Sequence, residues 1–146
     1  MRSAEWSIRP GCSQDIDEVL ALWLAAGSPP SATDTHEGLA CLLAADGDAL
    51  LIAESDGRLV ASLIAAWDGW RASFYRLAVH PDWRRRGLAT AMLREAERRL
   101  RARGATRLTA IVAHDDPVAM GFWEAAGYLR QPEQARLVRS GTARPA

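Results

Sequence analysis

The strongest chemical signal in this sequence is a run of three arginines followed by small residues at the start of a helical stretch: Arg84, Arg85, Arg86, Gly87, Leu88, Ala89 and Thr90. Cations at the N-terminal end of a helix are unfavourable by about 0.3–1 kcal/mol each, because that end carries the positive pole of the helix dipole. The first helical amides also lack acceptors, and Gly87 leaves the backbone accessible. Together these features predict a cradle for a phosphate or pyrophosphate group.

Two other readings of the arginine run are weaker. A solvated charge cluster would need nearby carboxylates, and Glu95 and Glu97 lie too far along the helix to neutralise all three cations. A nucleic-acid-binding protein usually has an extended basic surface. This chain has 18 basic and 18 acidic residues and no formal net charge, which argues against that function. No Gly-Lys-Ser/Thr follows the arginines, and the second and third glycines of a dinucleotide fingerprint are missing.

The segments around this motif are predicted to form, in order, a strand, a turn, a loop, a helix and a second strand. Residues 72–79 are an apolar run that Pro81 ends, residues 88–103 form an amphipathic helix ended by Gly104, and residues 106–112 are rich in β-branched side chains. The second strand should pair parallel to the first, because a helix connects them. In a regular strand, residues 73, 75, 77 and 79 would share one face.

The rest of the chain predicts a sheet with helices before and after it. Residues 6–9, 49–54 and 58–67 are further strands, and Asp-Gly turns at residues 56–57 and 68–69 predict an antiparallel meander. Helices are expected from residue 16, with Ser13 or Asp15 as the N-cap, and over 35–45 and 117–126. Short edge strands are expected at 128–130 and 136–139, within a single domain over residues 1–139 and before a flexible tail over residues 140–146.

Three ordered motifs resemble those of the GNAT superfamily of acyl-CoA N-acyltransferases. Residues 84–89 match its Arg/Gln-x-x-Gly-x-Gly/Ala motif, residues 77–81 resemble its bulged central strand, and residues 119–128 resemble its last helix and the segment after it. The resemblance implies an α/β (α+β) fold. Its mixed, mostly antiparallel sheet would contain a splayed parallel pair and would be flanked by about four helices.

The resemblance also implies a cosubstrate, acetyl-CoA, and an amine acceptor. In this family the pantetheine arm lies along the central strand, here the backbone of Leu77, Ala78 and Val79, and the amides from Arg85 to Thr90 receive the pyrophosphate. The bulge aims one amide, at Leu77 or Val79, at the thioester carbonyl. The implied function is transfer of an acetyl group to a primary amine of a small molecule or of a peptide or protein N-terminus, by direct attack.

The acid–base residues of the family are not evident in this sequence. Trp123 stands where members carry a tyrosine acid, and an indole N–H is too weak an acid for that role. Asp116 occupies the position where family members carry an asparagine that braces pantetheine. Ile111 occupies the position where some members carry a glutamate on the parallel strand. Tyr75 is the leading candidate for a catalytic residue, with Tyr128 and Glu54 behind it. The alternative function is therefore an acyl-CoA-binding module without turnover.

Composition sets the remaining expectations. Cys12 and Cys41 are far apart, and the three histidines lack metal-ligand spacing, so we expect reduced thiols and no metal site. No apolar window suits a membrane span or a secretory signal, which predicts a cytoplasmic protein. The sequence leaves open whether the chain forms a homodimer, and which amine it takes. Candidates for acceptor contact follow the first helix: Asp34, His36 and Glu37.

Overall fold

A computed structural model describes residues 5–141 as two compact units that divide between Val112 and Ala113. Each unit is described by itself, and the expectation of one domain over residues 1–139 stays a prediction. Residues 142–146, which make up most of the predicted flexible tail, lie outside the described residues.

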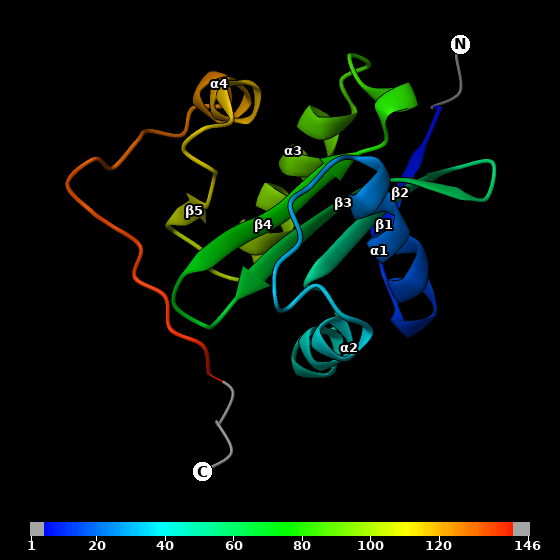
Figure 1. Ribbon diagram of the computed structural model, residues 1–146, viewed down its shortest axis with the longest axis horizontal. Coiled ribbons are helices and arrows are strands. Elements are labelled where there is room, and N and C mark those ends of the chain that lie inside the picture. The colour runs from blue at the N-terminus through cyan, green and yellow to red at the C-terminus, as the bar shows by residue number, and fades with distance from the viewer. Residues whose placement is uncertain (1–4, 142–146) are drawn as a thin grey trace. The chain divides into compact units, whose positions relative to one another are not determined.

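The first unit is built on a five-stranded sheet in the order β1-β2-β3-β4-β5 (Figure 1). The first four strands pair antiparallel, whereas β5 pairs parallel to β4, as the helical connection predicts. The strand bounds are β1 Ser7–Pro10, β2 Leu50–Ser55, β3 Arg58–Trp67, β4 Ala72–Val79 and β5 Leu108–Ala110. This sheet confirms the predicted mixed, mostly antiparallel fold, although β5 is shorter than the expected 106–112.

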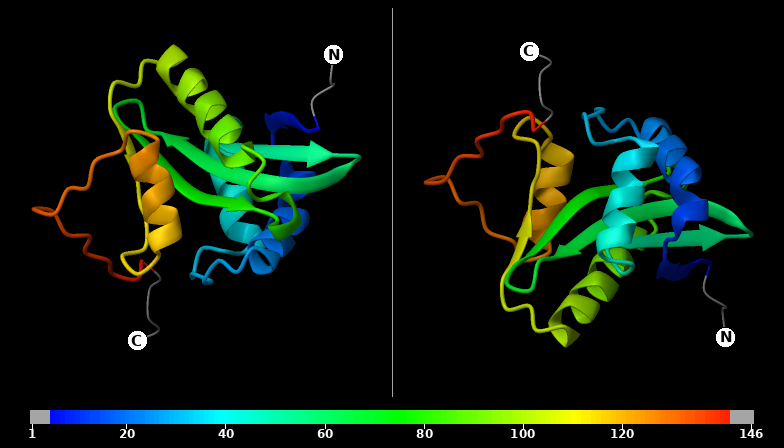
Figure 2. Two further views of the ribbon diagram at one scale, coloured as in Figure 1. Left: turned by 90° about the horizontal axis from the view of Figure 1, so that it is seen from above. Right: turned by 90° about the horizontal axis from the view of Figure 1, so that it is seen from below.

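Helices cover both faces of the sheet (Figure 2): α1 (Ile16–Ala25) and α2 (His36–Ala45) lie on one face, and α3 (Leu88–Ala102) lies on the other. Short 3-10 turns at Ser13–Asp15 and Pro81–Trp83 precede α1 and α3. Beneath α1 and α2, a buried apolar cluster joins the helices to β2, β3 and β4. Its buried members are Ile16, Val19, Leu22, Trp23, Leu39, Leu50, Ile52, Leu59, Ile64 and Ala78.

The second unit contains one helix, α4 (Pro117–Ala125), within the described residues. Asp116 is its N-cap, because the carboxylate accepts the Ala119 amide at 2.9 Å. The predicted edge strands at 128–130 and 136–139 are wrong: the described chain from Tyr128 to Gly141 forms no strand. Apolar side chains alone do not make a strand, which depends on a paired neighbour and on packing of one face.

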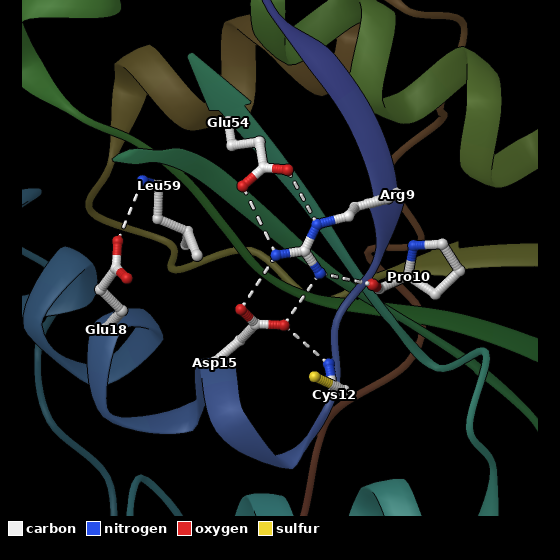
Figure 3. A network of polar contacts seen from close by, with 7 residues as sticks. All are labelled: Arg9, Pro10, Cys12, Asp15, Glu18, Glu54 and Leu59. Carbon is white, nitrogen blue, oxygen red and sulfur yellow. Dashed lines mark hydrogen bonds and ion pairs between the residues drawn. The ribbon is translucent and has the colours of Figure 1, made fainter. Parts of the chain in front are cut away.

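An ion-pair network ties the edge of the sheet to the start of α1 (Figure 3). Arg9 donates from Nη1 and Nη2 to both oxygens of Asp15 at 3.0 Å, and from Nε to Glu54 at 3.0 Å. The Asp15 carboxylate also accepts the Cys12 amide at 2.8 Å. The Asp15 side chain therefore binds Arg9 and stabilises the turn, and it makes no N-cap hydrogen bond to α1. The Arg9 hydrogen bond lowers the pKa of Asp15 to about 2.

We expect Asp15→Asn to lower the free energy of unfolding at pH 7 by about 1.5–3 kcal/mol, the usual contribution of a charged hydrogen bond. Because the folded-state pKa lies below that of the unfolded chain, the stabilisation is present above about pH 4 and is lost as pH falls toward 2. Urea unfolding of both proteins between pH 2 and pH 7 checks this. An unchanged stability difference at pH 2 would contradict it.

The charged face of α3 differs in part from the simple i,i+4 pattern. Glu95 pairs with Arg98 at 2.7 Å and with the expected Arg99 at 3.0 Å, and the Arg98 hydrogen bond is the main reason why the pKa of Glu95 falls to about 2. The i,i+4 spacing of Glu97 and Arg101 predicts a second pair on the exposed face of the helix, and this prediction is wrong. Glu97 is buried and pairs with Arg94 at 2.8 Å, since it points toward the interior of the unit.

Candidate functional site

The open end of the parallel pair begins in the middle of β4. β5 pairs only with Ala72, Ser73 and Phe74, so residues 75–79 have no strand partner on that side within the described chain. Ala78 is buried, whereas Leu77 and Val79 are partly exposed. The backbone segment predicted to receive pantetheine is therefore the part of β4 that the sheet leaves unpaired, where an extended ligand could add hydrogen bonds.

A β-bulge interrupts β4 just before this segment. Tyr75 lies opposite Ile64 and Ala78 lies opposite Ser62, so two residues of β4, Arg76 and Leu77, face one residue of β3. Arg76 has φ +54°, in the left-handed region. The structure thus has a bulge within the central strand, and such a bulge re-aims the backbone that follows it.

The bulge changes the expected faces of β4. Opposite residues of an antiparallel ladder share a face, and Tyr75 is opposite Ile64 whereas Val79 is opposite Ala61. Because Ile64 and Ala61 are three residues apart, they point to opposite faces. The prediction that residues 73, 75, 77 and 79 share one face is therefore wrong. Tyr75 lies on the face of α1 and α2, and 37% of it is exposed.

Unpaired amides line the start of α3. The turn before them is satisfied internally: the Trp83 amide donates to His80 at 2.8 Å, and the Arg84 amide donates to Pro81 at 3.4 Å. After Arg84, the next amide with a backbone acceptor is that of Ala91, which donates to Gly87 at 3.0 Å. Within the described chain the amides of residues 85–90 have no acceptor. A run of free amides at a helix N-terminus fits an anion.

The residues at the helix start leave room for a ligand. Gly87 is the N-cap with φ +80°, and a Cβ built on it would meet no atom within 4 Å. Leu88 is buried in the interior, while Ala89 is partly exposed and Thr90 is exposed. Leu88 can therefore contribute only its amide, whereas the small side chain of Ala89 lies at the rim of the cradle. These features fit a diphosphate group.

The structure gives the three arginines different surroundings. Arg84 turns back, and its guanidinium donates to the carbonyls of Val79 at 3.3 Å and Ala26 at 2.9 Å. Arg86 lies over the Trp83 ring at 4.5 Å and is 3.5 Å from a Glu5 oxygen. Arg85 is exposed, with φ +63° and no side-chain partner within residues 5–141.

Arg84 thus binds the carbonyl at the C-terminal end of α1, where the helix dipole favours a cation, and it also holds the end of β4. Of the three arginines, Arg85 is the one whose side chain has no partner among the described residues, so it could meet an anionic ligand. Sequence reasoning could not separate these roles, because three adjacent arginines carry no sign of which one folds back.

The second unit holds the other predicted binding residues, Asp116 and Trp123. The Asp116 carboxylate caps its own helix, as described above. Trp123 is buried and makes edge-to-face contacts with Phe122 at 5.5 Å and with Tyr128 at 5.0 Å between ring centroids. Tyr128, a secondary catalytic candidate, therefore belongs to an aromatic cluster.

Other candidates are engaged elsewhere in the first unit. Glu54 lies on β2, which β3 separates from β4, and it binds Arg9, so its role as a base stays a prediction. His36 Nδ1 lies 3.0 Å from an Asp17 oxygen at the surface, and Glu37 is exposed. Asp34 forms a bidentate ion pair with Arg76.

Arg76 is a further functional candidate, which was not predicted from the sequence. Its signal was present: it is a charged residue in the middle of an otherwise apolar strand.

Among residues 5–141, no group of three His, Cys, Asp or Glu side chains could hold a metal ion. No helix in the same range is long and apolar enough to cross a lipid bilayer. Both cysteines are free thiols.

Comparison with known proteins agrees with this geometry. The model of the acetyltransferase (GNAT) family matches residues 16–128. An acetyltransferase of Yersinia pestis is 35% identical over 117 residues, which cover 80% of this chain and 83% of the relative.

Two solved structures share the fold. Ard1 from Thermoplasma volcanium has a TM-score of 0.78 at 17% identity, covering 86% of this chain and 84% of that one. The PaiA N-acetyltransferase from Thermoplasma acidophilum, solved in complex with coenzyme A, has a TM-score of 0.74 at 16% identity, covering 88% and 92%.

Proposed function

Since this chain belongs to the GNAT family of acetyltransferases, we propose that it transfers an acetyl group from acetyl-CoA to a primary amine of a small molecule or of a peptide or protein N-terminus. The observation that carries the proposal is the run of amides over residues 85–90 that have no acceptor in the described chain, after a stretch of β4 that has no strand partner there. A fold neighbour solved with coenzyme A supports the choice of cosubstrate.

The diphosphate would bind at the start of α3. The amides of residues 85–90 would donate to its oxygens, Gly87 would allow the backbone to approach, and Arg85 would supply a cation. The unpaired backbone of Leu77, Ala78 and Val79 would hold the pantetheine arm as an added strand. The Val79 carbonyl already accepts Arg84, so the amides and the remaining carbonyls of this stretch are the groups to expect in contact.

The reaction needs an aligned amide more than a strong acid. Bound acetyl-CoA supplies an activated thioester. The amine nitrogen forms a bond to the acyl carbon, the C–S bond breaks, and the proton that the nitrogen loses passes to the departing thiolate or to water. An amide at the bulge, at Leu77 or Val79, would stabilise the negative charge that develops on the acyl oxygen. A thiolate is a good leaving group, so the chemistry does not depend on a tyrosine at position 123.

Tyr75 is the residue that we propose at the acceptor side of the cleft. It is partly exposed on the α1–α2 face, beside the last residue of β4 that pairs with β5. We expect Tyr75→Phe to lower kcat about 10-fold if the hydroxyl takes part in proton transfer, because general acid–base groups contribute about 10²–10⁴-fold and water can replace part of that. Steady-state kinetics with the accepted amine checks this. An unchanged kcat would remove the hydroxyl from the mechanism.

The test of the proposed function is thiol release from acetyl-CoA across a panel of amines that includes amino acids, polyamines, aminoglycosides and peptides with free N-termini. The expected result is release that depends on one class of amine, with the acetylated product seen by mass spectrometry. Absence of release with every amine, in a folded protein that still binds coenzyme A, would contradict it.

A catalytically silent acyl-CoA-binding module is the second candidate, and a specific observation favours it. Trp123 is buried among aromatic rings, and Asp116 caps α4 with one carboxylate oxygen, whereas the family carries a tyrosine acid and a bracing asparagine at these two positions. Calorimetric binding of coenzyme A without any amine-dependent chemistry would select this candidate. We place either activity in the cytoplasm, where the two free thiols would stay reduced.

A further inference from the structure

The feature that the proposed function does not yet explain is the arginine inside the bulge of β4. Arg76 adopts φ +54°, a conformation that glycine adopts freely and that a residue with a Cβ adopts at a cost. A strained residue persists only where its surroundings hold it, and such residues cluster at functional sites. The contacts of Arg76 therefore show what the bulge is fixed to.

The side chain of Arg76 is fixed to the connection between α1 and α2. Its Nε donates to Asp34 Oδ1 at 3.2 Å, and its Nη2 donates to Asp34 Oδ2. The two side chains are only 20% and 14% exposed, so the bidentate pair is largely shielded from water. Asp34 is held in turn by Ser31, whose amide donates to it at 2.9 Å and whose hydroxyl donates at 3.1 Å.

The backbone and the guanidinium of Arg76 have a second attachment, to α1. The Trp23 indole N–H donates to Ser62 Oγ at 2.8 Å, and that hydroxyl donates to the Arg76 carbonyl at 3.4 Å. Ser62 and Trp23 are both buried. The guanidinium also lies over the Trp23 ring at 5.4 Å from its centroid. Arg76 is thus held from α1, from β3 and from the α1–α2 connection at once.

Resting on the proposed function, we propose that Arg76 is a positioning residue for the acyl carbonyl. By tethering the bulge to Asp34 and Trp23, it orients the peptide at Leu77, on the stretch of β4 that lacks a strand partner, so that this amide faces the acyl oxygen. The same tether fixes the acceptor-side connection to the same point. Both carboxylate oxygens of Asp34 accept hydrogen bonds from Arg76, so in this proposal Asp34 does not bind the amine.

This role has a distinctive consequence. An amide aligned with the acyl oxygen stabilises the developing oxyanion more than the ground state, so loss of alignment lowers kcat. The amides that hold the diphosphate belong to a different segment, residues 85–90, and they make no use of Arg76. Affinity for coenzyme A, which has no acyl group, should therefore be spared. Affinity for acetyl-CoA should fall relative to that for coenzyme A.

The variants separate the tether from the backbone conformation. Arg76→Gly removes the tether and favours the left-handed conformation, so the bulge can persist without strain. Arg76→Lys keeps the charge but loses the two-pronged pairing. Asp34→Asn removes the partner's charge and replaces one of its two acceptor oxygens with an NH2 donor, so one of the two hydrogen bonds from Arg76 is lost. Asp15→Asn is the matched control, because Asp15 is another arginine-paired carboxylate, 12% exposed, and its partner Arg9 lies on the edge strand β1, away from β4.

The experiment measures kcat, the Kd of coenzyme A and the Kd of acetyl-CoA for the five proteins, together with hydrogen exchange at residues 31–34 and 77. For Arg76→Gly we expect kcat to fall about 10- to 100-fold, since loss of one oxyanion donor costs about 10²–10³-fold. The Kd of coenzyme A should stay within about twofold, and that of acetyl-CoA should rise about 3- to 10-fold, as for one lost hydrogen bond. Exchange should speed up at the named amides.

Asp34→Asn should show the same pattern at smaller amplitude, which keeps the test decisive if Arg76→Gly does not fold. Asp15→Asn should lose stability and keep both the kcat and the ratio of the two affinities. If the wild-type protein is active, and Arg76→Gly and Asp34→Asn keep its kcat and its ratio of the two affinities, this inference is overturned and the proposed function stands. A wild-type protein that neither binds coenzyme A nor acetylates any amine would overturn the proposed function and this inference together.

Discussion

Ala89→Glu should abolish binding of coenzyme A while leaving α3 intact. Ala89 is the second residue of the helix, partly exposed beside amides that have no acceptor in the described chain. A carboxylate there would occupy the space of the diphosphate and repel it, and a like charge in such a site costs several kcal/mol, or about 100-fold or more in Kd. Glutamate favours the first turn of a helix, so stability should not fall.

Calorimetry of coenzyme A with the wild type and two controls isolates this effect. Ala89→Gln keeps the size of glutamate without its charge, and its loss of affinity should be smaller. Ala102→Glu places the same residue at the exposed C-terminal end of α3 and should bind normally. Wild-type affinity in a folded Ala89→Glu protein would mean that the diphosphate does not bind at the start of α3.

Gly38→Ala should disturb the acceptor side and spare the cosubstrate side. A Cβ built on Gly38 would overlap the backbone carbonyl of Thr33 and would come within 3.1 Å of Thr35 Oγ1. A backbone carbonyl cannot swing away as a flexible side chain can, so the segment that carries Asp34 must shift. We expect a loss of about 1–3 kcal/mol in unfolding free energy, as for overpacking. The kcat/KM for the amine should fall about 10-fold or more, because small misplacements of this kind are costly.

Gly47→Ala is the matched control for this substitution, since a Cβ there would meet no atom within 4 Å and its φ is not positive. It should leave both stability and kinetics close to those of the wild type. The Kd of coenzyme A should be unchanged in both variants. A Gly38→Ala protein that loses coenzyme A affinity but keeps amine kinetics would reverse the assignment of the two sides.

Much of this architecture follows from local sequence signals. Period-2 and period-3.6 patterns predict the helices and the first four strands to within a few residues, and the Asp-Gly turns predict the antiparallel meander. The arginine-glycine motif predicts the amides at the start of α3 that have no acceptor in the described chain, because the first amides of a helix lack intrahelical partners and the small residues there let a ligand reach them.

The bulge limits what the sequence can predict. One extra residue at Arg76 reverses the faces of β4 beyond it, so Tyr75 and Val79 are separated although their spacing suggests one face. A register shift depends on the ladder with β3 and on the tether to Asp34, 42 residues away along the chain, and neither is visible in a local window. For the same reason the separate roles of Arg84 and Arg85 appear only in three dimensions.

The proposed function depends on a diphosphate held by the backbone between β4 and the first turn of α3. The most direct measurement is an amide NMR titration of the ¹⁵N-labelled protein with coenzyme A, with pantetheine as the ligand that lacks the diphosphate. We predict that the amides of residues 85–90 shift strongly with coenzyme A and weakly with pantetheine, while Leu77 and Val79 respond to both. Binding of coenzyme A that leaves residues 85–90 unshifted would contradict the proposed function.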